Sequence, residues 1–504
     1  MARRRALGWA AAAVVGVLGL GVGIGLLTAE EDDGPRVADP VGAVLRRMPA
    51  DAALVALVNT DPQGGQERRV GALLERIPGS TIALGELGGL LRLGDAGVGG
   101  GLPRALAGDP AAVAVTGDLR ERVAAWVVRD PGRLGEALDD AVGDGRLRDA
   151  GRAGDARVLA LRRPLPAPLR IAALAHAGPV LVAATTVELA RRTAARRAGP
   201  GAGVVRRLRA LRAAALVRFA GDGRRLARLP AAAALRDVVP EVVRGVREVD
   251  GTLEAAGGAF TGRAAVRLAP GSGVPLALGG APARAAAFAT PLVVGVRDPR
   301  PAFDALLRWL GAQRTYDRAS DVLRLLRRDD LDAVLRDQLT GTATAAVTPS
   351  GRLAPTDTTD ARVAVQAPLR DGGDLADLLE DVARVPDLLL GRADVDVDRD
   401  GDVYTVRLGE TEVRVAVVGD RLGVVRGPGD PVAVATRGPV RSTPPGAGAL
   451  AARLDADAVR EWLVARLGLP RLAALALGPI GDPTLALRAE PGRLDLELTV
   501  PITD

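Results

Sequence analysis

The sequence predicts an α+β protein: an N-terminal transmembrane helix followed by two tandem, internally duplicated α+β domains with mainly antiparallel sheets covered by amphipathic helices. Three observations lead to this prediction. A long uncharged run lies near the N-terminus. A short unit, in which an apolar strand ends in Asp and a helical pattern follows, recurs along the chain. The same order of units then returns in the second half.

The first element is the uncharged run, residues 7–29. About 20 apolar residues span a bilayer, and arginines such as Arg3–Arg5 before the run stay on the cytoplasmic side. Four acidic residues, 30–33, follow it directly. We therefore expect a cytoplasmic stub (1–6), an uncleaved anchor in the cell membrane, and a single-pass protein whose C-terminal domains are extracytoplasmic. A cleaved signal peptide is the alternative, but the run is long for one and 27–29 is a poor cleavage site.

Glycines within the anchor raise the question of a partner helix. Gly19 and Gly23, and likewise Gly21 and Gly25, have the G-x-x-x-G spacing that lets two membrane helices approach closely. This spacing would permit a homodimer through the anchor. The favoured explanation is a simple consequence of composition, since the chain contains 63 glycines.

The remaining chain has room for two domains of ordinary size. With 504 residues, 48% of them hydrophobic, it can bury two substantial cores. A stretch rich in Gly and Pro near residue 275 is the best boundary. The predicted segments are a linker over 30–40, a first domain over 41–270, a second linker over 271–283 and a second domain over 284–504.

The recurring unit is clearest at 124–142, AAWVVRDPGRLGEALDDAV. Asp is a good N-cap because its carboxylate accepts from the free N–H groups of the first turn, and Pro fits the first helical position. The apolar residues that follow are spaced as in the one-sided stripe of a helix lying on a sheet. Helix caps of this kind are predicted at Asp61, Asp130, Asp298 and Asp371.

The order of these units predicts a duplication. The aspartates Asp61, Asp130 and Asp222 correspond to Asp298, Asp371 and Asp457, at separations of 237, 241 and 235 residues. Short adjacent strands, such as those predicted over 158–161, 171–175 and 180–185, are typical of antiparallel meanders. Both halves also end in two strands.

Three segments of the first half resemble a known family. They are the N-x-D-P-x-x-x-Q stretch Asn59–Gln66, the following Ile77-Pro78-Gly79, and LAGDPAAVAVT (Leu106–Thr116). Together with the anchor they resemble the bacterial domain-of-unknown-function 3352 family. The resemblance covers most of the chain and implies a single-pass envelope protein with no assigned activity and no catalytic residues to transfer. The second half departs from the motif, with Arg297-Asp298-Pro299 and no matching Gln.

Composition narrows the chemistry. The chain has one histidine, no cysteine and no lysine, since all 67 basic residues are Arg. This excludes disulfides, thiolate chemistry, P-loop lysines and Schiff-base enzymes. His176 would have to serve any Ser-His-Asp triad, yet no G-x-S-x-G elbow accompanies it, so a structural role is favoured. A net charge of only +6 and 2% aromatic residues argue against a nucleic-acid partner.

One segment suggests a metal. Asp396, Asp398, Asp400 and Gly401 fit positions 1, 3, 5 and 6 of a calcium loop. Position 12, where a bidentate Glu belongs, is Arg407. The alternative is a strand with outward aspartates that ends in a hairpin turn. Calcium at these aspartates is the only cofactor that the sequence suggests.

These observations favour a non-catalytic binding or scaffold module of the cell envelope, not an enzyme. Its partners are the membrane, through the N-terminal helix, and an envelope protein or lipid. The alternative is a carrier of lipid or another apolar ligand at the membrane surface, because helices packed on curved sheets can leave an apolar cleft.

Overall fold

A computed structural model describes most of the two predicted domains. The residues that it describes are 37–59, 65–76, 110–116, 121–164, 171–195, 199–228, 240–270, 283–284, 292–300, 303–304, 331–348, 362–384, 395–408, 411–427, 429–436, 440–441, 450–457, 478–490 and 492–503. The predicted anchor and Asp61 lie outside these residues. None of the described helices is long and apolar enough to cross a membrane.

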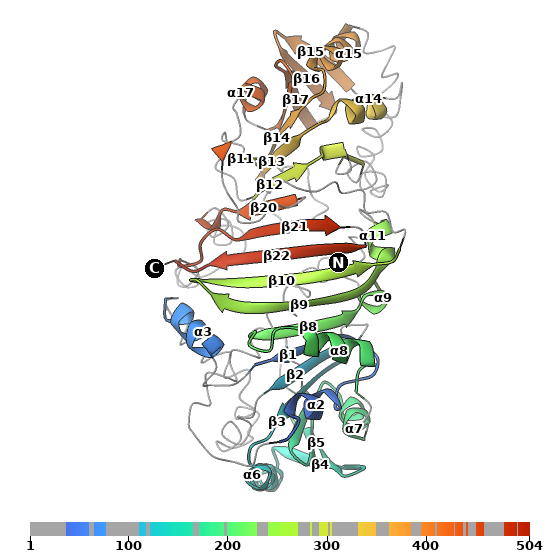
Figure 1. Cartoon of the computed structure of the whole chain (residues 1–504), viewed down its shortest axis with the longest axis vertical. Helices are drawn as coiled ribbons and strands as arrows, with labels where there is room; N and C mark the ends of the chain where they lie inside the picture. The colour runs from blue at the N-terminus through green and yellow to red at the C-terminus, as the bar shows by residue number, and fades with distance from the viewer. Residues whose placement is uncertain are drawn as a thin grey trace. The chain divides into compact units, whose positions relative to one another are not determined.

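The chain divides into two compact units. Unit 1 comprises Met1–Ala234, Val243–Ala269 and Ile502–Asp504, and unit 2 comprises Leu235–Val242 and Pro270–Pro501. Each unit is built on antiparallel strands with helices packed against them (Figure 1). The predicted α+β class with mainly antiparallel sheets is confirmed.

Unit 1 contains a sheet in which strands distant in sequence lie side by side. Its strands are β1 (Ala52–Val58), β2 (Ala111–Thr116), β3 (Arg122–Val127), β4 (Leu147–Ala153), β5 (Ala156–Leu161), β6 (Ala173–Ala177), β7 (Val180–Ala184), β8 (Val217–Asp222), β9 (Val246–Ala256) and β10 (Ala259–Leu268). Their spatial order is β4–β5–β6–β7–β3–β2–β1–β8–β9–β10, and every neighbouring pair is antiparallel. The meander β5–β6–β7 was predicted, whereas the edge strand β4 was not.

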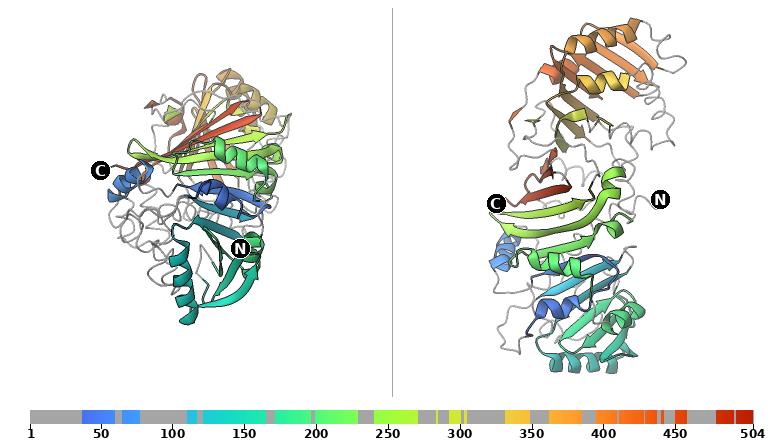
Figure 2. Two further views of the ribbon diagram at one scale, coloured as in Figure 1. Left: turned by 60° about the horizontal axis from the view of Figure 1, so that its bottom comes forward. Right: turned by 45° about the vertical axis from the view of Figure 1, so that its right-hand side comes forward.

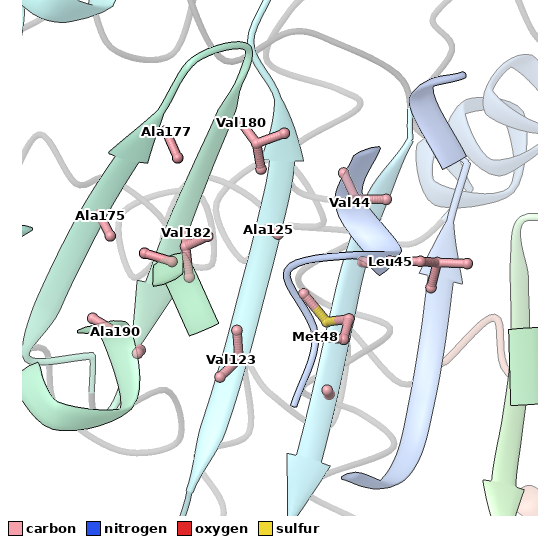
Figure 3. Packing of buried hydrophobic residues seen from close by; sticks show 14 of the residues in the cluster. Val44, Leu45, Met48, Val123, Ala125, Ala175, Ala177, Val180, Val182 and Ala190 are labelled. Carbon is pink, nitrogen blue, oxygen red and sulfur yellow. The ribbon is translucent and has the colours of Figure 1, made fainter. Parts of the chain in front are cut away.

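Helices cover this sheet. They are α2 (Pro40–Leu45), α3 (Gly65–Glu75), α6 (Pro131–Gly143), α7 (Val187–Ala195), α8 (Ala202–Ala210) and α9 (Gly223–Leu226). A further short helix, α11 (Pro240–Gly245), directly precedes β9 in the chain. Apolar residues of α2, α7 and α8 share one cluster with the sheet. In Figure 3, Val44, Leu45 and Met48 approach this face from the α2 segment and Ala190 approaches from α7.

Small side chains dominate the covered face. Ala or Val occupies every second position of β3, β6 and β7, with members such as Val123, Ala175 and Val182 almost completely buried. Alternation along a strand sends the intervening residues Leu174 and Leu181 to the opposite face. Both are fully buried as well. The sheet is therefore packed on both sides, which explains its near-continuous apolar strands.

Unit 2 has the same strand order. Its main sheet contains β12 (Leu292–Arg297), β13 (Thr342–Thr348), β14 (Arg362–Pro368), β15 (Val395–Asp400), β16 (Val403–Leu408), β17 (Thr411–Val417), β18 (Arg421–Arg426), β20 (Leu450–Leu454), β21 (Thr484–Glu490) and β22 (Arg493–Pro501). They are ordered β15–β16–β17–β18–β14–β13–β12–β20–β21–β22, all antiparallel. Strand for strand, this is the order of unit 1. A separate two-stranded ladder joins β11 (Ala283–Arg284) to β19 (Val440–Arg441).

Helices pack on both faces of the unit 2 sheet. They are α14 (Leu331–Gln338), α15 (Gly372–Arg384) and α17 (Pro431–Thr436). Val434 of α17 belongs to a cluster with Ala364 and Val425, whereas Leu375 of α15 belongs to another with Leu422. Figure 2 (right) shows α15 lying along the orange strands that include β15 and β17. In the chain, α15 follows β14 and α17 follows β18. The corresponding helices of unit 1 are α6, which follows β3, and α7, which follows β7.

One predicted correspondence is wrong in detail. Asp457 was expected to be the counterpart, in the second domain, of Asp222, which ends β8 and caps α9. The helical residues after β20 begin at Ala456, so Asp455 occupies the position before the helix and Asp457 lies inside it. The error arises because both aspartates lie within three residues of the strand end.

Candidate functional site

A surface groove of about 550 Å³ lies in unit 1 between α2 and α8. Figure 1 shows these helices on the same side of the sheet. Its lining combines an apolar floor with three arginines: Gly42, Leu45, Pro200, Ala202, Val205, Gly199, Arg46, Arg206 and Arg209. A volume of this size falls within the range of roughly 300–1,000 Å³ that small-molecule sites occupy.

Local sequence sets one wall of the groove. Asp39 caps α2, its carboxylate accepting from the Gly42 N–H at 2.8 Å, and Pro40 occupies the first turn. The chain returns to this wall at Gly199, which has a φ of +64°. A Cβ at Gly199 would lie 2.7 Å from the Leu45 carbonyl oxygen. Glycine is thus required both for the backbone conformation and for the close approach.

Ion pairs fix the other wall. Arg207 of α8 is largely buried, pairs with Glu248 and donates to the Gly221 carbonyl at 2.9 Å. Arg267 of β10 contacts Glu248 at 2.9 Å and Asp250 at 2.8 Å. Arg207, at one edge of this cluster, lies between Arg206 and Arg209 in sequence, so the cluster fixes the helix that presents the two groove arginines. Gly201 starts α8 without a side-chain cap.

The groove carries an excess of positive charge. In the part of the chain that the structure describes, Asp39 is the one carboxylate that pairs with its arginines, 3.9 Å from Arg46 and 3.1 Å from Arg209. The side chains of all three remain about half exposed, at 54%, 49% and 53% for Arg46, Asp39 and Arg209. Arg206 is exposed and forms no ion pair with another described residue. Exposed pairs are weak, so these guanidinium groups stay available to an anionic ligand.

His176 lies on β6, opposite Arg157 of β5 and Leu181 of β7. Burial lowers the pKa of His176, a hydrogen bond with the Gly178 backbone acts in the opposite direction, and the Arg157 charge lowers the pKa further. Its buried Nε2, like Nε1 of Trp126, has no hydrogen-bond partner among the described residues. Among the described residues no hydroxyl is placed on this Nε2, where a base would contact a nucleophile.

Three of the four predicted caps lie within the described residues. Asp130 caps α6, accepting from the Arg133 N–H at 2.9 Å. Asp371 precedes α15 and accepts from the N–H groups of Gly373 (2.9 Å) and Asp374 (3.4 Å).

Asp298 behaves differently from these two caps. It has a φ of +45°, and its carboxylate binds the Arg300 guanidinium at 2.7 and 2.9 Å. This bond is the main reason that the pKa of Asp298 is lowered. A hydrogen bond from the Arg300 backbone also lowers this pKa, so the carboxylate binds the guanidinium and meets a backbone N–H of the following turn as well.

The three aspartates of the calcium hypothesis lie on β15, in a hairpin with β16. Asp396, Asp398 and Asp400 are exposed on alternate positions, and Gly401 makes the turn with a φ of +59°. Arg407, at the twelfth position of the hypothetical loop, binds Asp396 at 3.0 Å across the hairpin. Within the described residues, no group of three His, Cys, Asp or Glu side chains is placed to hold a metal ion.

The groove itself was not predicted from the sequence. Its arginines are Arg46 on one side and Arg206 and Arg209 on the other, far apart in the chain. A cluster of four arginines over 206–212 was the one available signal, but arginines are spread throughout this sequence. The fold is what brings them together.

The structure thus defines a class: an α+β protein of two antiparallel units, with an arginine-lined groove on the first. No family model matches the chain, and no curated protein matches it either. Three solved structures are similar in part. Crystal form IV of TP0453 is 12% identical with a TM-score of 0.24, covering 42% of this chain and 76% of that chain.

Two further crystal forms of TP0453 give similar values. Form III is 11% identical with a TM-score of 0.24, covering 44% of this chain and 94% of that one. Form I is 6% identical with a TM-score of 0.26, covering 44% and 78%. TM-scores of this size are too low to indicate a shared fold.

Proposed function

We propose that this chain is a single-pass membrane-anchored protein of the cell envelope, whose two units lie outside the cytoplasm and act by binding, without catalysis. The observation that carries the binding role is the groove between α2 and α8, which has the volume of a ligand site. Its wall α2 starts at Pro40, at the end of the expected linker. The charge pattern around residues 7–29 supports the anchor.

The absence of catalysis is supported by composition and by the surroundings of the one histidine. Without Cys or Lys, few groups titrate near neutral pH, where general acid–base catalysis is most effective. His176 has a lowered pKa and lies beside Arg157. The aspartates Asp130 and Asp371 are occupied by the N–H groups of their helices.

We also infer that the two units are copies of one ancestral domain, related to the bacterial family named above. Ten strands in each unit follow one another in the same spatial order. Such an order includes pairings between strands distant in sequence, such as β3 with β7 and β14 with β18. Two unrelated domains would rarely share these non-local pairings, which supports duplication. Pairing of two chains through Gly19 and Gly23 remains part of this proposal.

A lipid carrier is the second candidate. The apolar floor of the groove, with Leu45 and Val205, favours it. The packed Ala and Val faces of unit 1 favour the binding module, because filled cores leave no room for acyl chains.

Alkaline carbonate extraction of membranes tests the anchor. We expect the full chain to stay with the membrane pellet, and a variant lacking residues 7–29 to appear in the soluble fraction. Release of the full chain by carbonate would overturn the proposal.

Lipid analysis distinguishes the two proposed functions, a binding module and a lipid carrier. The full chain, purified in detergent and exchanged into fresh micelles, is extracted with organic solvent and its lipids are quantified by mass spectrometry. A binding module retains far less than one lipid per chain. Retention of one lipid per chain that persists when Arg46, Arg206 and Arg209 are replaced by Gln would establish the carrier instead, because a carrier holds the acyl chains and not only the head group.

A further inference from the structure

We propose that the groove between α2 and α8 binds the head group of an anionic phospholipid and so holds unit 1 against the membrane that anchors the chain. This inference rests on the proposed anchor. It assigns the groove a ligand class and gives unit 1 a defined membrane-facing side.

Charge complementarity is the first argument. Arg46, Arg206 and Arg209 line the groove, and Asp39 is the only carboxylate that pairs with any of them among the described residues. Two positive charges therefore remain uncompensated. Guanidinium groups bind phosphate oxygens with paired N–H donors, which makes Arg suited to a phosphodiester.

The lining also fits an amphiphile better than a free anion. Leu45, Pro200 and Val205 form an apolar part of the groove lining beside the arginines. An inorganic ion would leave this floor in contact with water, whereas the glycerol and first methylene groups of a lipid would cover it. Removal of apolar surface from water favours the lipid.

The position of the groove along the chain is the third argument. Asp39 lies ten positions after the end of the predicted anchor, residue 29, so ten Cα–Cα steps join them. Fully extended, they reach at most about 35 Å. A tether this short keeps the groove at a high effective concentration beside the membrane surface, so individually weak contacts suffice. Anionic lipids attract arginines that lie near such a surface.

Rigidity of the groove supports a defined site. Arg207 lies between the groove residues Arg206 and Arg209 of α8 and is fixed by Glu248 and the Gly221 carbonyl. Gly199 lets the opposite segment approach Leu45 closely. The guanidinium groups are therefore presented on backbone that is already in place before a lipid arrives.

Native mass spectrometry of the full chain in a neutral detergent provides the test. Phosphatidylglycerol and phosphatidylcholine are added at equal concentrations, and the ratio of bound species is measured. The variant Arg46→Gln/Arg206→Gln/Arg209→Gln is compared with Arg133→Gln/Arg148→Gln/Arg152→Gln, which changes the net charge equally at exposed sites of unit 1. We expect the preference for phosphatidylglycerol to fall at least fivefold in the groove variant and to persist in the control.

A single substitution at an exposed position tests the groove in case the triple variant does not fold. Arg206 is exposed and without a described ion-pair partner, so Arg206→Glu leaves the packing of unit 1 unchanged and should still reduce the preference; Arg148→Glu is its control. The preference should also fall as salt rises from about 50 mM to about 500 mM.

Three results would overturn the inference. They are an unchanged preference in both groove variants, an equal loss in the controls, or displacement of the lipid by an equal concentration of inorganic phosphate, which would identify a free-anion site. A wrong anchor prediction would give a different result: carbonate would release the full chain from the membrane, while its preference for phosphatidylglycerol would be unchanged.

Discussion

Aspartate residues at strand ends start several helices of this protein. Asp130, Asp222 and Asp371 each accept backbone N–H groups of the turn that follows. The caps recur because at most three residues separate each of these strands from the helix that follows, and Asp satisfies the free donors of the first turn. Asp298 differs from these caps because its carboxylate also binds the guanidinium of Arg300, in addition to a hydrogen bond with the Arg300 backbone.

Replacing Asp130 with Ala should lower the free energy of unfolding of unit 1 by about 1 kcal/mol, since the Arg133 N–H loses its acceptor. Urea unfolding followed by circular dichroism measures the loss. Asp140→Ala is the matched control, being exposed on the same helix without capping it. An equal effect of both substitutions would contradict the capping role.

His176 should make the free energy of unfolding depend on pH near and below the ordinary histidine pKa. Burial lowers its pKa below the ordinary value of 6.5. Below that pH the unfolded chain binds a proton that the folded chain does not, so stability falls as the pH decreases toward the folded pKa. Above it, both states are neutral and the effect vanishes.

The chain has no other histidine, which makes the prediction direct. Between about pH 7.5 and about pH 5.5, Tm should fall more in the wild type than in His176→Gln, which has no titrating group there. Differential scanning calorimetry at both pH values gives the comparison. Parallel falls in the two proteins would show that the imidazole does not lose its proton on folding.

At the scale of elements, the hairpin β15–β16 and the groove helices differ in how well the sequence predicts them. Alternation of Val and Asp over 395–400 indicates a strand with an outward acidic face, and the structure has it. The edge strand β4 (LRDAGRA) was missed because both its faces are largely polar, and a bulge at Gly151 interrupts its alternation. Edge strands often carry charged residues and bulges, so their sequences lack the apolar alternation that predicts a strand.

Calcium should not stabilise the hairpin. Residues two apart on a strand are about 6.6 Å apart, so three carboxylates at 396, 398 and 400 are too widely spaced to share one ion with bonds of about 2.4 Å. Tm of the full chain in detergent should be the same with millimolar calcium as with a chelator. A rise that Asp398→Ala abolishes would instead establish the calcium loop.

The groove was not predicted, although the sequence predicts many of the strands and helices around it. Local patterns specify strands and helices, but not which strands become neighbours. The predicted first domain contains all the groove residues, yet α2 and α8 meet only because β8 pairs with β1. That pairing joins residues more than 150 positions apart and depends on the packing of the whole unit.

For the whole molecule, the repeated spacing of aspartates indicated two similar domains, and the described strands follow the same order in each unit. What the sequence did not supply is the insertion of β3 between β2 and β7, because non-local neighbours leave no periodic trace. The membrane anchor rests on the sequence alone, since residues 7–29 lie outside the described part of the chain.

Site-directed labelling of intact cells tests the central claim, a chain anchored with both units outside the cytoplasm. The protein lacks cysteine, so a single introduced thiol reports only its own position. Asp51→Cys and Asp398→Cys, both exposed, should react with a membrane-impermeant maleimide on intact spheroplasts, whereas Ala6→Cys should react only after lysis. Labelling of Ala6→Cys in intact spheroplasts, or protection of the other two until lysis, would contradict the account.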